Sequence, residues 1–374
     1  MNLELSPDQQ ELVRSVRSLA EREFGPTAFA AERPTTFFRD RARRLAELGY
    51  VGITFPESDG GQGGDLLDAI IVLREVARVC PHSGDVVQAY NFGGVRQLQA
   101  TGSPELKERW LRPALRGEVL ISLAMSEPGA GSGLSSLSTR AEVHGEKVVI
   151  SGSKVFSTHG VDADLIIVWC RFGDGPRGIG AVAVPQETAG FTRGKTERFM
   201  SGEPYCQMYF NECEVPVQNV LVSQDGLRQL MPVFNVERIG NATRALAVSG
   251  TAFEMAVDYA CSRQVNGTLL KDLQGIQWKF ADMKLRLEAA WLLVYRAASV
   301  SGGPTDVETA MAKCFANEAA MFVADEALQI FGAYGYSTEY PVEYIFRRVR
   351  GWRIAGGTTE ILRNRIAKNV FTGR

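Results

Sequence analysis

This 374-residue chain has little histidine, no paired cysteines and no long apolar run. Its 3 histidines and 6 cysteines stand at no spacing typical of a metal site, and CxxC pairs are absent, so we expect neither a metal nor a disulfide framework. No segment approaches the roughly 18 apolar residues that a membrane helix needs. The first residues, Met1–Glu4, lack the basic and apolar regions of a signal peptide. These absences predict a cytoplasmic protein with reduced thiols.

An excess of positive charge is also missing. The formal net charge is −2, so no basic surplus is available to neutralise phosphates, which argues against a nucleic-acid partner. Hydrophobic residues make up 45% of the chain and charged residues 22%, the balance of a soluble globular protein. The length is enough for two or three packed units. Composition therefore favours small-molecule chemistry.

The first third of the chain has helical patterns. Ser6-Pro7-Asp8-Gln9 is a capping box with proline at the first helical position, and helical periodicity returns at 66–79 and 105–115. A second helix ends near Gly49, and the glycine-rich segment 56–64 is a loop. We expect an all-helical domain over residues 1–122.

The middle of the chain changes to strand patterns. Short apolar or alternating runs predict strands at 147–151, 165–170, 179–184, 207–210 and 215–222. A GxGxxG match at 173–178 lies between two of these strands, and no helix follows it, so we interpret it as a hairpin turn rather than a dinucleotide-binding loop. Residues 123–226 are expected to form an antiparallel β-barrel or sandwich.

The last third is helical again. The predicted helices cover 227–263, 269–300, a segment from the Thr305–Glu308 capping box to about 331, and a segment after Gly357. Helices of this length predict a bundle over residues 227–374. The whole fold is expected to be α+β, with an N-terminal helical domain, a middle antiparallel β-barrel or sandwich and a C-terminal helical bundle.

Two loops rich in small residues are candidates for ligand binding. In the first, 123–132, glycines, alanine and proline leave main-chain N–H groups accessible, and Ser126 and Ser132 add hydroxyl groups. The second, 152–160, follows one predicted hairpin later. Each loop alone is also typical of an ordinary connection.

The order of these motifs resembles the acyl-CoA dehydrogenase family. The two loops are followed at the expected offsets by Arg263, Gln274, the run 329–335 and the run 356–360. The resemblance covers nearly the whole chain. It implies the three-part fold, an FAD cofactor, oxidation of an acyl thioester, an electron-transfer flavoprotein as electron acceptor and a homo-oligomer of four subunits.

The catalytic base of most family members is missing from its usual position. That position is Gly356, although the rest of 354–361 keeps the family pattern. Glu237 falls instead on a helical stripe of otherwise apolar or small residues, where burial favours its protonated form and suits it to act as a base. The isovaleryl-CoA and long-chain branches of the family resemble this arrangement. The alternative is that Glu237 pairs with a cation and is structural.

The resemblance also implies roles for single residues. Gly356 is expected to offer its N–H to the thioester oxygen and to leave space for a branched or bulky acyl group. The implied cofactor-binding residues are Leu123, Met125, Ser126, Ser132, Phe156, Ser157, Thr158, Arg263, Gln274, Gln329, Gly332, Ala333, Thr358 and Glu360. The implied substrate-binding residues are Ser132, Asn235, Arg238 and Gly357, with a salt bridge as the alternative role of Arg238. Gly133, Asn235, Asn266, Thr268 and Arg348 depart from the family pattern, Arg348 by replacing an aspartate. Together these departures leave weaker flavin binding and a carrier other than CoA open.

Our first hypothesis is therefore FAD-dependent α,β-dehydrogenation of a branched or bulky acyl-CoA, with Glu237 taking the α proton. One alternative is the same reaction on an acyl or aminoacyl group that is tethered to a carrier protein. Another is a flavin monooxygenase or nitroalkane oxidase on the same fold. The loss of the usual glutamate also motivates a third alternative, a non-catalytic subunit that partners a catalytic homologue.

Overall fold

The computed structural model describes residues 5–30, 36–300 and 302–372. The chain divides into two compact units. The helical unit consists of Met1–Arg33, Leu66–Asp85 and Asn235–Arg374, and the sheet unit consists of Pro34–Asp65 and Val86–Phe234. Met1–Glu4, on which the expected absence of a signal peptide rests, lies outside the described residues. The domain boundaries near residues 122 and 226 stay predictions.

The helical unit begins with α1 (Pro7–Glu23), which starts at the predicted capping box. The Gln9 N–H donates to Ser6 Oγ and the Ser6 N–H donates to Gln9 Oε1, each at 3.2 Å. Helix α1 packs against α3 (Leu66–Val79), whose bounds match the predicted helix 66–79. Local sequence alone therefore sets these two elements.

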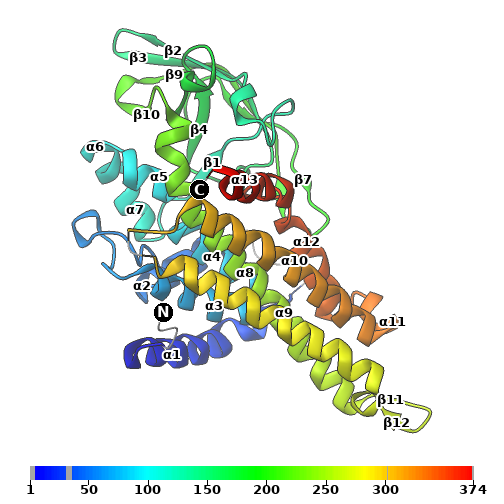
Figure 1. Ribbon diagram of the computed structural model, residues 1–374. Coiled ribbons are helices and arrows are strands. Elements are labelled where there is room, and N and C mark those ends of the chain that lie inside the picture. The colour runs from blue at the N-terminus through cyan, green and yellow to red at the C-terminus, as the bar shows by residue number, and fades with distance from the viewer. Residues whose placement is uncertain (1–4, 31–35, 301, 373–374) are drawn as a thin grey trace. The chain divides into compact units, whose positions relative to one another are not determined.

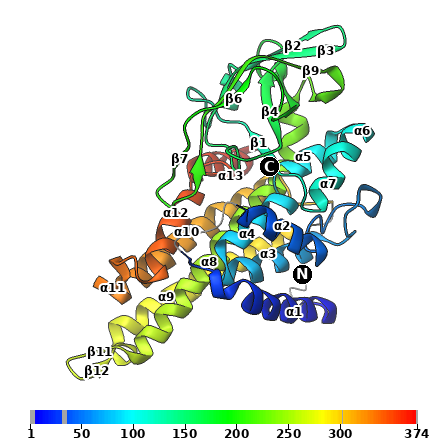
Figure 2. The same ribbon diagram turned by 180° about the vertical axis from the view of Figure 1, so that it is seen from behind.

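Three long helices, α8, α9 and α10, run side by side in the helical unit (Figures 1 and 2). Helices α8 (Gly226–Ser262) and α10 (Asp306–Phe331) confirm their predictions, and the Glu308 N–H donates to Thr305 Oγ1 at 3.2 Å to cap α10. Helix α9 (Gln274–Ala298) begins later than the predicted residue 269. The reason is a short hairpin of β11 (Gln264–Val265) and β12 (Thr268–Leu269), followed by a 3₁₀ turn at Leu270–Asp272.

Helices that the sequence patterns did not resolve follow α10. They are α11 (Ala333–Tyr336) and α12 (Pro341–Trp352). Helix α12 buries Val342, Ile345 and Val349 at helical spacing, which gives it one apolar face. The last helix, α13 (Thr359–Thr372), begins after Gly357 as predicted and packs on α10. Within residues 5–30, 36–300 and 302–372, no helix is long and apolar enough to cross a bilayer.

The sheet unit is organised around an eight-stranded sheet. Its strands are β1 (Ile121–Ala124), β2 (Arg140–His144), β3 (Lys147–Lys154), β4 (Leu165–Arg171), β5 (Ile179–Pro185), β6 (Phe191–Arg193), β9 (Met208–Pro216) and β10 (Val220–Val222). Their order is β10-β5-β4-β2-β3-β9-β6, with β1 beside β4. Most neighbours are antiparallel, as predicted, but β1 and β2 both run parallel to β4. Strands β7 (Glu197–Arg198) and β8 (Pro204–Tyr205) pair separately.

The core of the sheet unit contains the hairpin of β4 and β5. Every residue of β5 and all but the last of β4 are buried, which explains their unbroken apolar sequences. The turn between them contains the GxGxxG match. A Cβ at Gly178 would lie 2.0 Å from Gly173 O, so the turn needs glycine at that position. The hairpin interpretation of this motif is confirmed.

The two predicted strands 207–210 and 215–222 are wrong in extent. Strand β9 runs unbroken through Met208–Pro216, and β10 follows a 3₁₀ turn at Val217–Asn219. The pairing of β3 with β9 shifts register between Ile150 and Gly152, opposite two consecutive exposed residues, Asn211 and Glu212. This irregularity interrupts the period-two alternation, so the sequence pattern indicated two strands where there is one.

Short helices complete the sheet unit. They are α2 (Phe37–Glu47), α5 (Gly94–Thr101), α6 (Pro104–Leu106) and α7 (Arg112–Leu115). The predicted helix 105–115 is interrupted by a π-helical turn at Lys107–Leu111 between α6 and α7. Helix α4 (Pro81–Asn91) belongs to both units and, like α5, was absent from the sequence-based prediction, because nearly all of its residues are buried and no polar face marks a helical period.

Candidate functional site

The carboxylate of Glu237 lies beside the turn that contains Gly356. Glu237 is half-buried on α8, and Gly356 precedes α13 with a φ of +71°. A Cβ built at Gly356 would lie 3.2 Å from Glu237 Oε2. A carboxylate from α8 therefore reaches the place from which a side chain at position 356 would extend. This is the arrangement that the sequence predicted for a relocated base.

Three buried polar side chains from two helices hold this turn. Arg238 Nε donates to Gly356 O at 2.9 Å, and Lys313 Nζ donates to Gly357 O at 2.9 Å. Asn317 Nδ2 donates to Trp352 O at 2.7 Å. Because these carbonyl groups accept from fixed buried donors, the peptide planes of the turn are held in fixed orientations.

Lys313 and Asn317 were missed by the sequence analysis. They lie one helical turn apart on α10, and both are fully buried among alanines such as Ala310, Ala316 and Ala320. A lysine and an asparagine on a face of small residues are the available signal, because a buried polar group needs a partner to offset its lost hydration. The partners themselves are distant in sequence.

Arg238 is tied to its own helix and to α10. Its NH1 group donates to Asn235 Oδ1 at 3.0 Å and lies 3.6 Å from Asp306 Oδ1. Burial lowers the pKa of Arg238, and the carboxylates of Glu237 and Asp306 oppose that shift. These contacts agree with the salt-bridge alternative, while the substrate-binding roles of Arg238, Asn235 and Gly357 stay predictions.

Arg348, which replaces a family aspartate, has a buried partner. Arg348 NH2 and Arg244 NH1 both donate to the carboxylate of Asp85 on α4, the latter at 2.6 Å. Both guanidinium groups also lie over the ring of Trp352, at 5.3 and 5.2 Å from its centroid. Asp85 thus supplies the negative charge that position 348 lacks. The substitution has a structural explanation within the helical unit and gives no independent support to a carrier other than CoA.

A buried ion pair joins the two small-residue loops of the sheet unit. Lys154 Nζ donates to Glu127 Oε1 at 2.8 Å and to Met125 O at 3.0 Å. Glu127 also accepts from the Ser138 N–H at 2.7 Å, and the Val155 N–H donates to Ser126 O at 2.9 Å. The loops are therefore fixed to each other by bonds that leave their outer surfaces available.

The charges of this pair are strongly influenced by burial. Burial alone would raise the pKa of Glu127, but donors from Lys154 and Ser138 lower it to about 2. Burial lowers the pKa of Lys154, and Glu127 opposes that shift. This pairing was not predictable from the sequence patterns, because a glutamate and a lysine in glycine-rich loops are ordinarily exposed.

The predicted ring-contacting residues differ in exposure. Leu123 belongs to β1, so the loop itself begins at Met125. Phe156 is 56% exposed with a φ of +59°, and its ring lies 5.2 Å from that of Tyr205. Ser157 Oγ is buried and has no hydrogen-bond partner among the described residues. These loops therefore offer an exposed aromatic face and an unused polar atom, whereas Ser132 and Thr158 are simply exposed.

The predicted cofactor residues of the helical unit form two separate groups. Thr358 and Glu360 lie at the start of α13, where the Ile361 N–H donates to Thr358 Oγ1 at 3.3 Å. The second group lies at the far ends of α8, α9 and α10 and consists of Arg263, Gln274, Gln329, Gly332 and Ala333. Arg263 follows Glu237 by a length of helix that spans about 39 Å at 1.5 Å per residue. The two groups do not converge within one helical unit, which fits the expectation of cofactor contacts from another subunit.

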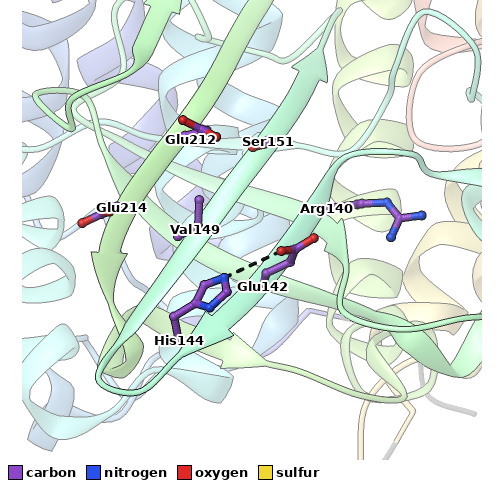
Figure 3. A pocket seen from close by; sticks show the side chains of 7 residues that line it. All are labelled: Arg140, Glu142, His144, Val149, Ser151, Glu212 and Glu214. Atoms are coloured by element: carbon purple, nitrogen blue, oxygen red, sulfur yellow. Dashed lines mark ion pairs between the residues drawn. The ribbon is translucent and has the colours of Figure 1, made fainter.

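A hollow of about 400 Å³ lies on the sheet (Figure 3). Its lining side chains come from β2, β3 and β9 and are Arg140, Glu142, His144, Val149, Ser151, Glu212 and Glu214. They are mostly exposed, and the one close pair is His144 Nε2 with Glu142 Oε2 at 3.7 Å. None of the predicted site residues lies in it, so it has no part in the chemistry considered below.

Comparison with known proteins places these features in a family. The models described as acyl-CoA dehydrogenase N-terminal, middle and C-terminal domain match residues 6–118, 122–213 and 224–371. An acyl-CoA dehydrogenase of Bacillus subtilis (strain 168) is 35% identical over 378 residues, which cover 99% of this chain and 100% of that protein. This chain belongs to the acyl-CoA dehydrogenase family.

Solved structures agree with this assignment. Butyryl-CoA dehydrogenase from Megasphaera elsdenii superposes with a TM-score of 0.92 at 32% identity, covering 99% of this chain and 100% of that one. A chain from the structure reported as the electron transferring flavoprotein of Acidaminococcus fermentans superposes with a TM-score of 0.93 at 32% identity, covering 100% of both chains. The expected acyl-CoA dehydrogenase fold is confirmed, and the chain is an oxidoreductase of the type that acts on CH–CH groups.

Acyl-CoA dehydrogenases are FAD-dependent. The exposed ring of Phe156 and the unpartnered Ser157 Oγ fit a flat cofactor ring with polar edges. Glycines and alanine between Met125 and Ser132 suit close backbone approach, since no Cβ is present at Gly129 and Gly131 and nothing lies within 4 Å of where one would be. The residues present in the sheet unit thus fit the cofactor of the family.

Gly356→Ala is expected to slow flavin reduction by acyl-CoA about tenfold or more. A left-handed backbone costs a non-glycine residue about 1–3 kcal/mol, and about 1.4 kcal/mol on the reaction barrier is a factor of ten in rate. The alanine would adopt a left-handed φ, and its Cβ would lie 3.2 Å from Glu237 Oε2 and 3.3 Å from Lys313 Cε. Single-turnover absorbance measures the rate. The control is Gly351→Ala on α12, where a Cβ meets nothing within 4 Å. Equal rates for the two variants would contradict the tight geometry at Gly356.

Proposed function

We propose that this acyl-CoA dehydrogenase removes the α proton of an acyl thioester with Glu237 and forms an α,β double bond. The observation that carries the proposal is the 3.2 Å between Glu237 Oε2 and the Cβ position at Gly356, since that is where the usual base of the family would begin. This placement of the base is similar to that in the isovaleryl-CoA and long-chain branches.

The protein residues perform two tasks. Glu237 accepts the α proton, and the Gly356 N–H donates to the thioester oxygen, on which negative charge develops. Arg238 and Lys313 fix the carbonyl groups of Gly356 and Gly357, and so hold the two peptide planes that directly follow Gly356. When bound, FAD supplies the acceptor for the β hydrogen and its electron pair. Met125, Ser126, Phe156 and Thr158 are the sheet-unit residues proposed to hold its ring.

We propose a branched or bulky acyl group as substrate, because position 356 carries no side chain. Part of the space is used by Glu237 and Lys313, whose atoms lie 3.2 and 3.3 Å from the Cβ position, so the extra room is smaller than a glycine alone would imply. CoA is the proposed carrier, because the relatives named above are an acyl-CoA dehydrogenase and a butyryl-CoA dehydrogenase.

An electron-transfer flavoprotein is the proposed acceptor of the electrons. Support comes from the fold match with a chain of the electron transferring flavoprotein structure of Acidaminococcus fermentans. We also propose a homo-oligomer, because the second group of cofactor residues around Arg263 lies far from Glu237 along α8.

The test is anaerobic titration of the purified flavoprotein with butanoyl-CoA, 3-methylbutanoyl-CoA and cyclohexanecarbonyl-CoA, followed by flavin absorbance. Bleaching by at least one of them is expected, with the branched or cyclic thioester faster than the straight one. Fastest reduction by butanoyl-CoA would contradict the branched substrate but not the reaction. Bound flavin that none of the three reduces would contradict the proposed reaction on CoA thioesters, and carrier-protein thioesters and oxygen consumption would be measured next.

A further inference from the structure

We propose that Lys313 is a positioning residue of this active site, which holds the Gly356–Gly357 turn in place and keeps the neighbouring base Glu237 in its ionised form. The inference rests on the proposed function, because it concerns the base of that reaction. Lys313 touches none of the reacting atoms in this account and acts through the turn and through its charge.

Lys313 donates hydrogen bonds to the last residue of α12 and to the loop that precedes α13. Lys313 Nζ donates to Gly357 O at 2.9 Å and to Trp352 O at 3.3 Å. These two carbonyl groups lie at opposite ends of the segment that contains Gly356. One ammonium group therefore closes the segment, and it does so from α10, which packs against both α12 and α13.

The same side chain lies beside the carboxylate of Glu237. Lys313 Cε is 3.3 Å and Glu237 Oε2 is 3.2 Å from the Cβ position at Gly356, so these two atoms are no more than about 6.5 Å apart, the sum of the two distances. The two charges interact, and a nearby opposite charge favours the ionised form of a carboxyl group. The base on α8 thus has a cationic neighbour on α10.

Few other charged or titratable groups face Lys313. They are Glu237 and Arg238 from α8 and Cys314 from its own helix. Lys313 is 0% exposed, and burial lowers its pKa to about 7, with Glu237 opposing and Arg238 adding to the shift. The charge of Lys313 is therefore lost as the pH rises above neutrality, well below the usual range of a lysine. A lysine that only filled space would not connect the rate to this titration.

The experiment compares the pH dependence of single-turnover flavin reduction in wild type, Lys313→Met and Lys313→Arg. Methionine has a similar length without charge, but the carbonyl groups of Gly357 and Trp352 lose this donor, so the midpoint of thermal unfolding is measured first to establish that the variant folds. Lys284→Met is the control, because Lys284 is 62% exposed on α9 and pairs with Glu288. Its pH profile is expected to match that of wild type.

Wild type is expected to lose rate as the pH rises through about 7. Lys313→Met is expected to lack this descending limb and to reach half of its maximal rate at a higher pH than wild type, since the cation that favours the ionised base is gone. Lys313→Arg stays charged at all of these pH values and is expected to keep its rate above pH 7. Identical descending limbs in all three proteins would overturn the inference.

A second measurement needs no activity. Because the pKa of Lys313 lies near 7 in the folded chain and near the usual 10.5 of a lysine in the unfolded chain, the unfolded state binds more protons between these values. The stability of wild type relative to Lys313→Met is therefore expected to rise as the pH increases from about 7 to about 10.5. A constant difference would contradict the buried charge. If none of the thioesters reduced the flavin of wild type, that result would contradict the proposed function instead.

Discussion

Glu237→Gln is expected to slow flavin reduction by acyl-CoA about 10²- to 10⁴-fold, the usual contribution of a general base, while flavin content and the midpoint of thermal unfolding stay close to wild type. The amide keeps the shape and hydrogen-bonding capacity of the side chain but does not accept the α proton. The rate is measured by anaerobic stopped-flow absorbance with the best thioester of the panel.

A control on the same helix separates the base from a general effect of charge on α8. Glu254 lies on α8, its side chain is 51% exposed, and it pairs with Arg78 at 2.8 Å. Glu254→Gln is expected to leave the rate within about twofold of wild type, since exposed ion pairs contribute little. An unchanged rate in Glu237→Gln, together with a lower unfolding midpoint, would support the structural role of Glu237 and would show that another group is the base.

Lys154→Met is expected to destabilise the protein by about 3–5 kcal/mol, because the carboxylate of Glu127 would stay buried without its cation. The side chains of Lys154 and Glu127 are 0% and 3% exposed, so water does not replace the lost cation as a partner of the carboxylate. The loops that Glu127 and Lys154 join carry the proposed ring contacts, so flavin content is expected to fall as well. Urea unfolding and the flavin-to-protein absorbance ratio measure the two effects.

The matched control is Lys147→Met on the same strand. Lys147 pairs with Glu214 at 2.7 Å, but the two side chains are 64% and 55% exposed. The expected loss is about 0–1 kcal/mol. Equal stability losses in Lys147→Met and Lys154→Met would contradict the account of the buried pair.

The stability that Glu127 contributes depends on acid pH. Its pKa is about 2 in the folded chain, below the usual 4.5 of a glutamate, so the folded state binds fewer protons between these values. The contribution is complete above about pH 4.5 and is lost as the pH falls toward 2. The difference in unfolding free energy between wild type and Lys154→Met is therefore expected to shrink over this interval.

Local features of the fold followed from the sequence because their causes are local. The capping box at Ser6, the bounds of α3 and the hairpin turn at Gly178 each depend on residues a few positions apart. The long strand β9 did not follow, because an irregular pairing with β3 interrupts its alternation. That pairing is a property of two strands and is absent from the pattern of either one.

The candidate site followed from the sequence only in part. Gly356 was recognisable as a departure from the family pattern, and Glu237 as a carboxylate on a helical stripe of apolar or small residues. The structure brings the two residues together. Their surroundings were not predictable in the same way. Asp85 and Arg348 are 263 residues apart in sequence, and Lys313 and Gly357 are 44 apart. Such partners are selected by packing, which periodicity does not encode.

Proton exchange at the α carbon tests the role of Glu237 most directly. The substrate is 3,3-dimethylbutanoyl-CoA, whose β carbon carries no hydrogen, so loss of the α proton is not followed by dehydrogenation. In D₂O, wild type is expected to replace its α hydrogens with deuterium, measured by mass spectrometry, whereas Glu237→Gln is expected to do so at least about 10²-fold more slowly. Exchange at the wild-type rate in Glu237→Gln would show that another group is the base.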